Sequence, residues 1–161
     1  MRTAILTIST SVSRRESDDA SGPLLARLAE EAGADVVAME VVPDDFGLIE
    51  DRLHHFADEG FSFVFTTGGT GLTVDDVTPE ATRAVIEREA PGIAEALRAE
   101  SLKHTPMGLL SRGVAGVRRR TLIVNFPGSP RAVQQTFGVL APVLQHAAAT
   151  LSRDGGRTRG H

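Results

Sequence analysis

A glycine-rich segment that ends in two aspartates is the part of the sequence most suggestive of chemistry. The stretch TTGGTGLTVDDVTP, at 66–79, directly follows the apolar run 61–65. Glycine tolerates positive φ, so its backbone can approach a ligand closely, and consecutive free N–H groups form a concave site for anions. Thr67 and Thr70, which lie beside the three glycines, supply hydroxyl donors. The segment therefore predicts a phosphate cradle, and a tight turn without a ligand is the alternative.

Acidic residues beside this segment predict a cation. Four aspartates follow the ends of two apolar runs: Asp44, Asp45, Asp75 and Asp76. Acids beside a phosphate cradle would repel the ligand, but Mg²⁺ bridges one or two carboxylates to phosphate oxygens. The alternative is that all four are solvated turn or capping residues, and we favour it for Asp45 and Asp75.

Two later segments carry further candidates. NFPGSP, at 125–130, again brings a glycine to the end of an apolar run, and Ser129 could cap a helix whose N-terminus attracts negative charge. Capping alone would also explain Ser129. Arg112, in LLSRG, could contact a carboxylate or phosphate, with a surface ion pair as the alternative. Residues 118–120, three arginines, are predicted to be a solvated hairpin tip.

Composition excludes several classes of site. The 161 residues contain no cysteine, and the only lysine, Lys103, precedes His104, so a Walker A loop is excluded. The histidines form no metal motif, and no G-x-S-x-G elbow occurs. A net charge of −4 and an aromatic content of 4% argue against nucleic acid. No run approaches the roughly 18 apolar residues of a membrane span, and the N-terminus has too short an apolar run for a signal peptide, so we expect a cytoplasmic protein with no membrane partner.

The elements that must position these residues alternate between strands and helices. Apolar runs at 3–8, 36–42 and 61–65 predict strands, and the second, apolar at nearly every position, is predicted to be covered on both faces. Helical spacing follows the first two runs, from Pro23 to Gly33 and from 48 to 60. This βαβαβ order predicts a parallel sheet between helices.

The second half of the chain predicts three more helices and a hairpin. Thr78 is expected to cap one helix, and Pro91 to begin another that reaches about residue 101. The runs 109–117 and 121–126 predict an antiparallel pair of strands. The last helix begins near Pro130 and should be kinked by Pro142. We expect one domain over 1–151 and a disordered polar tail over 152–161.

Four polar or glycine-rich segments then converge on one edge of the sheet. They follow the four predicted parallel strands, and ligands bind beyond the carboxyl ends of such strands. The segments are 9–13, 43–45, 67–76 and 125–129.

Five segments in this order resemble the molybdopterin-binding family, which includes the MogA and MoaB proteins and the G domain of gephyrin. FTTGGTG, four residues and then DVTPEAT resemble its signature. SRRESDDASG, VVPDD, LSR and NFPGSP resemble its other motifs, so the resemblance extends over about 150 residues. It implies a three-layer α/β/α sandwich with a mostly parallel mixed sheet and one short antiparallel hairpin, assembled as a homotrimer or homohexamer.

The resemblance also implies a reaction. With ATP and Mg²⁺, molybdopterin would be adenylylated to adenylyl-molybdopterin and pyrophosphate, and a downstream molybdate-insertion protein would be the partner that uses the product. Asp44 and Asp76 match the family's functional aspartates and would hold the metal. The loop of Thr67, Gly68, Gly69, Thr70 and Gly71 would cradle phosphate. The pterin or nucleotide pocket would be lined by Ser111, Asn125, Pro127, Gly128 and Ser129.

One departure from the family pattern keeps a second function open. An arginine often precedes the aspartate of DVTP in this family, whereas Val74 and Asp75 stand there in this chain. The extra acid weakens attraction for a nucleotide, so a MoaB-type oligomer that binds molybdopterin without adenylylating it is the alternative. An unrelated phospholigand enzyme on a similar sheet ranks last.

Overall fold

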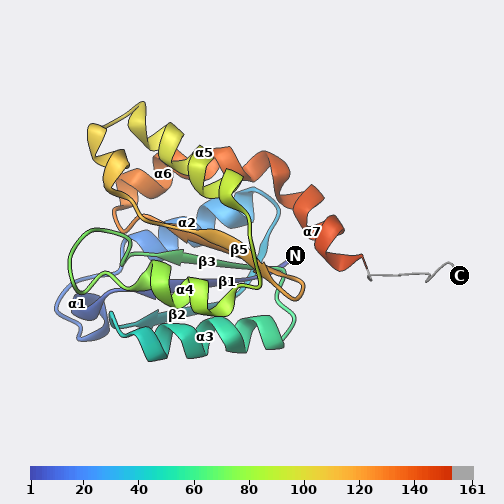
Figure 1. Ribbon diagram of the computed structural model, residues 1–161, viewed down its shortest axis with the longest axis horizontal. Helices are drawn as coiled ribbons and strands as arrows, with labels where there is room; N and C mark the ends of the chain where they lie inside the picture. The colour runs from blue at the N-terminus through green and yellow to red at the C-terminus, as the bar shows by residue number, and fades with distance from the viewer. Residues whose placement is uncertain (154–161) are drawn as a thin grey trace, which may run out of the picture.

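The alternating apolar runs form a six-stranded sheet with helices on both faces (Figure 1). The computed structural model describes residues 1–153. The strands are β1 (Arg2–Ile8), β2 (Asp35–Val42), β3 (Phe63–Thr67), β4 (Arg88–Glu89), β5 (Ala115–Arg118) and β6 (Thr121–Phe126). The longer helices are α2 (Ser21–Glu31), α3 (Phe46–Asp58), α4 (Thr78–Val85), α5 (Pro91–Leu102), α6 (Pro130–Leu140) and α7 (Leu144–Ser152). Three short helices are α1 (Thr10–Ser13) and the 3₁₀ turns η1 (Pro106–Leu110) and η2 (Ala141–Val143).

The sheet is mixed and mostly parallel, in the order β2-β1-β3-β6-β5-β4. β1 pairs in parallel with β2 and β3, and β3 pairs in parallel with β6. β5 forms the predicted antiparallel hairpin with β6. The two-residue strand β4 pairs antiparallel with the other edge of β5. The predicted fold class is therefore confirmed.

Two apolar clusters hold the helices to the sheet because successive strand residues point to opposite faces. On one face, Phe63, Phe65 and Phe126 pack against α2, α5 and α6. On the other, Val64 and Ile123 pack against α3 and α4. Figure 1 shows these three layers, with α3 and α4 on the side opposite α5 and α6.

Strand β2 corrects one expectation. It was predicted to be covered on both faces, but it is an edge strand whose side chains alternate in exposure. Val37 and Met39 are each 50% exposed and Val41 is 41% exposed. The sequence is apolar on both faces, yet these three side chains stay exposed, while Ala38 and Val42 pack against one apolar cluster and Val36 against the other.

The segment before β5 corrects a second expectation. Residues 109–117 were predicted to form a strand, but the strand begins only at Ala115. Pro106 opens the turn η1 instead, and the Thr105 hydroxyl caps it by accepting the N–H of Met107 at 3.2 Å. Proline suits the first turn of a helix, and the turn that it begins includes both Leu109 and Leu110, which the prediction had placed in the strand.

The last helix is interrupted as predicted. η2 contains Pro142 and separates α6 from α7. Ser152, the first residue of the predicted tail, ends α7, and Arg153 after it is exposed. The other residues of that prediction, 154–161, lie outside the described residues. Among residues 1–153, no helix is both long and apolar enough to cross a membrane.

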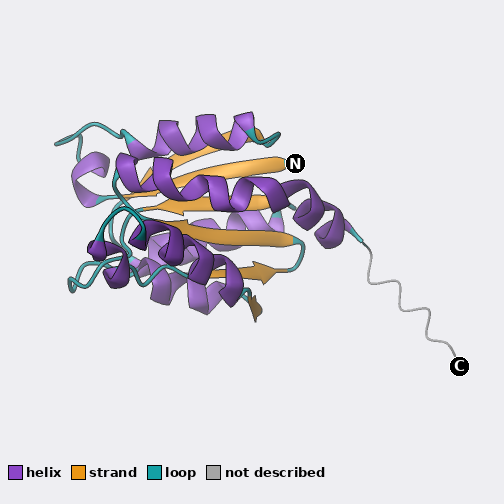
Figure 2. Cartoon of the chain, turned by 90° about the horizontal axis from the view of Figure 1, so that it is seen from above, coloured by secondary structure: helices purple, strands orange, loops and turns teal. Residues whose placement is uncertain are grey.

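The strand order creates a crevice at one edge of the sheet. β1 lies between β2 and β3, and the connecting helices α2 and α3 pack on opposite faces. Ligands of open α/β sheets bind where the connections diverge in this way, beyond the carboxyl ends of the strands. The loops that leave these ends gather at the left of Figure 2.

Candidate functional site

The loop after β3 has the backbone geometry for which its glycines are needed. Gly68 and Gly69 have φ values of 102° and 69°, a region that side chains strongly disfavour. A Cβ on Gly68 would collide with the carbonyl oxygen of Ile8, the last residue of β1. A Cβ on Gly128, in the loop after β6, would come within 3.3 Å of the Gly68 Cα. Gly68 is therefore the point where the ends of three parallel strands touch.

Three neighbouring N–H groups of this loop remain available. The Gly68 N–H donates to the Phe126 carbonyl at 3.2 Å, and the Thr78 N–H and hydroxyl donate to the carbonyls of Gly69 and Gly68. The N–H groups of Gly69, Thr70 and Gly71 meet no acceptor within residues 1–153. Three adjacent free donors are the geometry that an anion site requires, and the predicted phosphate cradle stays a prediction. Thr78 therefore fixes this loop with its side chain and does not cap α4 with it, which corrects that expectation.

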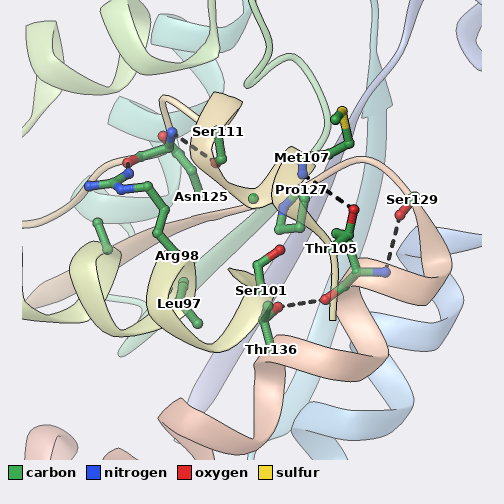
Figure 3. Close-up of a pocket in the computed structure, with 14 residues that line it drawn as sticks. Leu97, Arg98, Ser101, Thr105, Met107, Ser111, Asn125, Pro127, Ser129 and Thr136 are labelled. Carbon is green, nitrogen blue, oxygen red and sulfur yellow. Dashed lines mark hydrogen bonds between the residues drawn. The ribbon is translucent and has the colours of Figure 1, made fainter. Parts of the chain in front are cut away.

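Three adjoining clefts run along this edge of the sheet. The glycine cleft, about 340 Å³, lies between the loops after β3 and β6 and is lined by residues that include Gly69, Thr70, Gly71, Asp76, Ser111 and Gly128. The helix cleft, about 270 Å³, lies between α5, η1 and α6 and is lined by residues that include Leu97, Arg98, Ser101, Thr105, Met107 and Thr136 (Figure 3). The serine cleft, about 260 Å³, is lined by residues that include Ser9, Ser11, Ser17, Asp18, Asp19 and Ser21. The glycine cleft shares Met107, Ser111 and Pro127 with the helix cleft and Gly128 with the serine cleft.

The clefts bring together all but one of the residues predicted for the site. The serine cleft includes Thr67 and Gly68. The helix cleft includes Ser111, Asn125, Pro127 and Ser129, and the glycine cleft the remaining ones except Asp44. Two hydroxyls are already engaged, because Thr67 donates to the Pro127 carbonyl at 2.7 Å and Ser129 caps α6 by accepting the Ala132 N–H.

Asp44 lies behind the glycine loop and lines none of the three clefts. Its Oδ2 accepts the N–H and hydroxyl of Thr10 at 3.1 and 3.0 Å. Its Oδ1 points to the loop, since a Cβ on Gly69 would come within 3.2 Å of it. Asp44 therefore joins the end of β2 to the start of α1 and leaves one carboxylate oxygen facing the glycines.

Asp76 presents its carboxylate to the glycine cleft. Its Oδ2 accepts the N–H and hydroxyl of Thr73 at 3.0 and 2.9 Å, which closes a short turn, and it lies 2.8 Å from the Cβ position of Gly71. The neighbouring Asp75 is exposed, and Val74 is 93% exposed, so this pair forms the tip of the loop. The two adjacent acids therefore differ in position: Asp76 lines the glycine cleft, whereas Asp75 is exposed to solvent, as expected for a turn residue.

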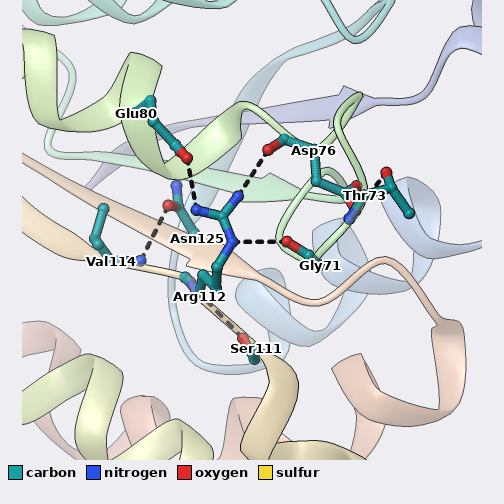
Figure 4. Close-up of polar contacts among 9 residues, drawn as sticks. Gly71, Thr73, Asp76, Glu80, Ser111, Arg112, Val114 and Asn125 are labelled. Atoms are coloured by element: carbon teal, nitrogen blue, oxygen red, sulfur yellow. Dashed lines mark hydrogen bonds and ion pairs between the residues drawn. The ribbon is translucent and has the colours of Figure 1, made fainter.

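Asn125 is a buried link between four elements. Its amide N–H groups donate to the hydroxyls of Thr66 and Thr82, each at 3.0 Å. Its oxygen accepts the Val114 N–H at 3.1 Å (Figure 4). Asn125 is 4% exposed, so its lining of the helix cleft is mainly structural. Its predicted binding role stays a prediction.

Replacing Asn125 with Ala is expected to lower the free energy of unfolding by about 2–4 kcal/mol, because buried donors and acceptors lose their partner and a small cavity forms. Urea unfolding followed by circular dichroism measures this change. Gln134→Ala, at an exposed position of α6, is the control and should change stability by less than about 0.5 kcal/mol. Equal effects of the two substitutions would contradict the structural role.

Arg112 contacts carbonyl groups and a carboxylate of the protein, so of the two alternatives it fits the ion pair. Its Nη1 lies 2.5 Å from Oε1 of Glu80, and its remaining N–H groups reach the carbonyls of Gly71 and Asp76 (Figure 4). The hydrogen bond from Arg112 holds the pKa of the Glu80 carboxyl below its ordinary value, so this pair is charged at neutral pH.

Several lining residues are not among those that the sequence predicts. Arg98, Ser101, Thr105 and Met107 enter the helix cleft from α5 and η1. The sequence does contain a signal for this short helix, because Thr105 is a capping residue and the proline after it suits a first helical turn. The strand predicted at 109–117 did not take this signal into account.

The charges of the clefts bear on the expected metal. Of the described residues that line the three clefts, Arg98 is the only cationic one, whereas Asp18, Asp19 and Asp76 are acidic. Within residues 1–153, no group of three acidic or histidine side chains could cage a metal ion. Asp44 and Asp76 each keep an oxygen without a hydrogen-bond partner in the described chain. This donor set suits Mg²⁺ that arrives with a polyphosphate and needs only one or two protein carboxylates.

Comparison with known proteins agrees with this architecture. The family of probable molybdopterin binding domains matches residues 4–146. The crystal structure of MoaB from Thermus thermophilus is 44% identical, with a TM-score of 0.88, and the alignment covers 94% of this chain and 96% of that one. A MogA structure is 39% identical, with a TM-score of 0.90 and coverage of 94% and 100%.

Curated relatives include both short and long proteins. Molybdopterin adenylyltransferase of Haemophilus influenzae is 43% identical over 143 residues, which are 84% of this chain and 73% of the relative. The Drosophila melanogaster molybdenum cofactor synthesis protein cinnamon is 40% identical, but the chain spans only 25% of its length. The alignment with Dictyostelium discoideum gephyrin covers 22% of that protein. This chain therefore belongs to the family of probable molybdopterin binding domains to which the MogA and MoaB proteins of molybdenum cofactor biosynthesis belong.

Proposed function

We propose that the protein adenylylates molybdopterin with Mg-ATP. The reaction forms a bond between the terminal phosphate of molybdopterin and the α-phosphorus of ATP. The bond from that phosphorus to the β-phosphate bridge oxygen breaks, and pyrophosphate leaves with the bonding electrons. Relatives named molybdopterin adenylyltransferase, 35–44% identical to this chain, support the proposal.

The observation that carries the proposal is the position of the glycine cleft between two other clefts. A transfer between two substrates needs a phosphate site that both can reach. The glycine cleft shares lining residues with the helix cleft on one side and with the serine cleft on the other. Two bound molecules could thus present their phosphates to the N–H groups of Gly69, Thr70 and Gly71 from opposite sides.

The chemistry of the outer clefts suggests which substrate each takes. The serine cleft offers the carboxylate of Asp18 and the hydroxyls of Ser11 and Ser17, which suit the diol of a ribose. The helix cleft has the apolar wall of Leu97 and Met107 and the hydroxyls of Ser101 and Ser111. A flat ring with polar edges, such as a pterin, fits this combination.

The protein's part in the chemistry is positioning and charge stabilisation. The attacking phosphate is already anionic, so the reaction needs no strong general base. Holding both phosphates at one set of N–H groups makes attack effectively unimolecular, and those donors stabilise charge that develops on the phosphoryl oxygens. Asp76, in the glycine cleft, and Asp44, on the other side of the glycine loop, are the residues that would hold the Mg²⁺ that ATP brings. The ion would neutralise charge on the polyphosphate.

An ATP-to-pyrophosphate assay tests the proposal. Pyrophosphate release is expected only when ATP, Mg²⁺ and molybdopterin are all present. Release from ATP without molybdopterin, or no release with all three, would overturn the adenylyltransferase assignment. The predicted homotrimer or homohexamer stays a prediction that light scattering can measure in the same preparation.

One observation favours a second candidate, a MoaB-type protein that binds molybdopterin without adenylylating it. Asp75 adds a negative charge at the tip of the loop, and among residues 1–153 the only cation that lines the three clefts is Arg98. This candidate predicts saturable molybdopterin binding, measured by isothermal titration calorimetry, together with no pyrophosphate release. The same two measurements therefore separate the candidates.

If the protein adenylylates molybdopterin, replacing Asp75 with Arg is expected to lower KM for Mg-ATP by about two- to five-fold in low salt, because two charge units change near the polyphosphate. Steady-state pyrophosphate release at two salt concentrations measures the effect, which should shrink as salt rises. Asp35→Arg makes the same charge change at the opposite end of β2 and should leave KM unchanged. A salt-independent effect would contradict the electrostatic explanation.

A further inference from the structure

Arg112 ties the segment 71–76, which carries Asp76, to the rest of the protein. Its Nε donates to the Gly71 carbonyl and its Nη2 to the Asp76 carbonyl, each at 2.7 Å, so one guanidinium reaches both ends of the segment (Figure 4). Its own N–H donates to the Thr70 carbonyl at 2.8 Å, which fixes the arginine beside the loop. Within the described part of the chain, no other hydrogen bond joins 71–76 to residues outside it.

Packing provides little further restraint on this segment. Leu72 is 64% exposed and Val74 is 93% exposed, so neither side chain anchors the loop in the core. The hydrogen bonds within the segment run between Thr73 and Asp76 and hold a local turn only. The placement of the Asp76 carboxylate relative to the glycine cleft therefore depends on the guanidinium of Arg112.

We propose that Arg112 is a positioning residue that sets the Asp76 carboxylate and the Gly71 N–H for the transfer step. This inference rests on the proposed adenylyl transfer for its kinetic consequence. Arg112 acts through Asp76 and the loop, because its Nε, Nη1 and Nη2 each donate to an oxygen of the protein. A displacement of about 1 Å in such a group can cost on the order of 100-fold in rate.

The guanidinium is required because it is planar and donates in several fixed directions at once. Glu80, in the first turn of α4, binds Nη1 and so sets the plane of the group, while Nε and Nη2 face the two carbonyls. A lysine ammonium carries the same charge on one atom and cannot span both carbonyls with Glu80. Arg112→Lys therefore keeps the charge and removes the geometry.

The kinetic test compares Arg112→Lys with the wild-type full chain in the pyrophosphate assay. We expect kcat to fall by about 30- to 100-fold while KM for molybdopterin and its measured binding change by less than about three-fold. In the Asp76→Asn background, Arg112→Lys should cause less than about a three-fold further loss, because the two residues act as one unit. Independent, multiplying losses would overturn the inference.

Arg52→Lys is the matched control. Arg52, in α3, also forms a two-bond ion pair, with Glu40 of β2. This substitution should leave kcat unchanged. Glu80→Gln is a milder variant for the case in which Arg112→Lys does not fold, and its kcat should fall by about three- to ten-fold. An unchanged kcat in Glu80→Gln would show that the orientation of Arg112 does not matter.

Hydrogen exchange tests the tie without using activity. Amide exchange in residues 71–76 should speed up by about ten-fold or more in Arg112→Lys, with no change in Arg52→Lys. Unchanged exchange would overturn the positioning role even if the wild type is active. Faster exchange in Arg112→Lys, when the wild-type protein releases no pyrophosphate, would instead refute the proposed function and leave the tie intact.

Discussion

The Asp76→Asn variant is expected to release pyrophosphate with a kcat about 100- to 1000-fold below that of the wild type. In the part of the chain that the structure describes, Asp76 is the only carboxylate that lines the glycine cleft. Its loss removes the protein ligand proposed for the metal and leaves polyphosphate charge less well neutralised in the transition state. The size of the effect is that of one removed electrostatic contact at a reacting phosphate.

Stability should hardly change in this variant. Asparagine keeps an oxygen that can accept the N–H and hydroxyl of Thr73, and the turn is exposed. We expect the free energy of unfolding to change by less than about 1 kcal/mol, measured by urea denaturation. Full activity with ATP and molybdopterin would remove Asp76 from the mechanism, and an equally large loss of folding would leave it with a structural role only.

Asp75→Asn is the matched control for Asp76→Asn, because it makes the same chemical change one residue earlier. Asp75 is exposed at the tip of the loop. Its kcat should stay within about two-fold of the wild type, and any gain should appear in KM for Mg-ATP. A large loss of kcat in both variants would indicate a general effect of loop charge.

Periodicity predicted most of the fold, because the buried faces repeat at fixed intervals in sequence. The spacing of Val133, Phe137, Leu140 and Leu144 predicted the last helix, and all four are buried. Periodicity does not show whether both faces of β2 are covered by other elements. The apolar residues of β2 indicate a strand, but whether neighbours cover both faces depends on strand order, which local pattern does not encode.

The site was predictable where backbone conformation restricts residue type. Glycine suits the φ of 102° at Gly68, and at Gly69 it avoids the collision of a Cβ with the Thr78 hydroxyl, so the loop was visible in the sequence. The role of Arg112 was not, because its partners Gly71 and Asp76 lie 41 and 36 residues away. Contacts from a side chain to distant carbonyls leave no periodic trace in a sequence.

Some glycines of this chain lie where a Cβ would collide with the protein, and others lie where a Cβ would meet open space. Gly68→Ala tests a glycine of the first kind. Gly68 lies at the junction of β1, β3 and β6, where a Cβ would strike the Ile8 carbonyl oxygen and the backbone has a φ of 102°. Both strands that would have to move are fixed by parallel pairing. We expect the free energy of unfolding to fall by about 3–5 kcal/mol, the sum of backbone strain and overpacking.

Gly138→Ala makes the same substitution with the opposite expected sign. Gly138 lies within α6, is exposed and has nothing within 4 Å of its Cβ position. Alanine there should stabilise the protein by about 0.5–1 kcal/mol, because glycine is the weaker helix former. Thermal unfolding of the two variants should therefore shift in opposite directions, by roughly 2–4 °C for each kcal/mol. A mild effect of Gly68→Ala would mean that the strand ends can separate, and the phosphate cradle would then lose the rigid support on which the proposed chemistry depends.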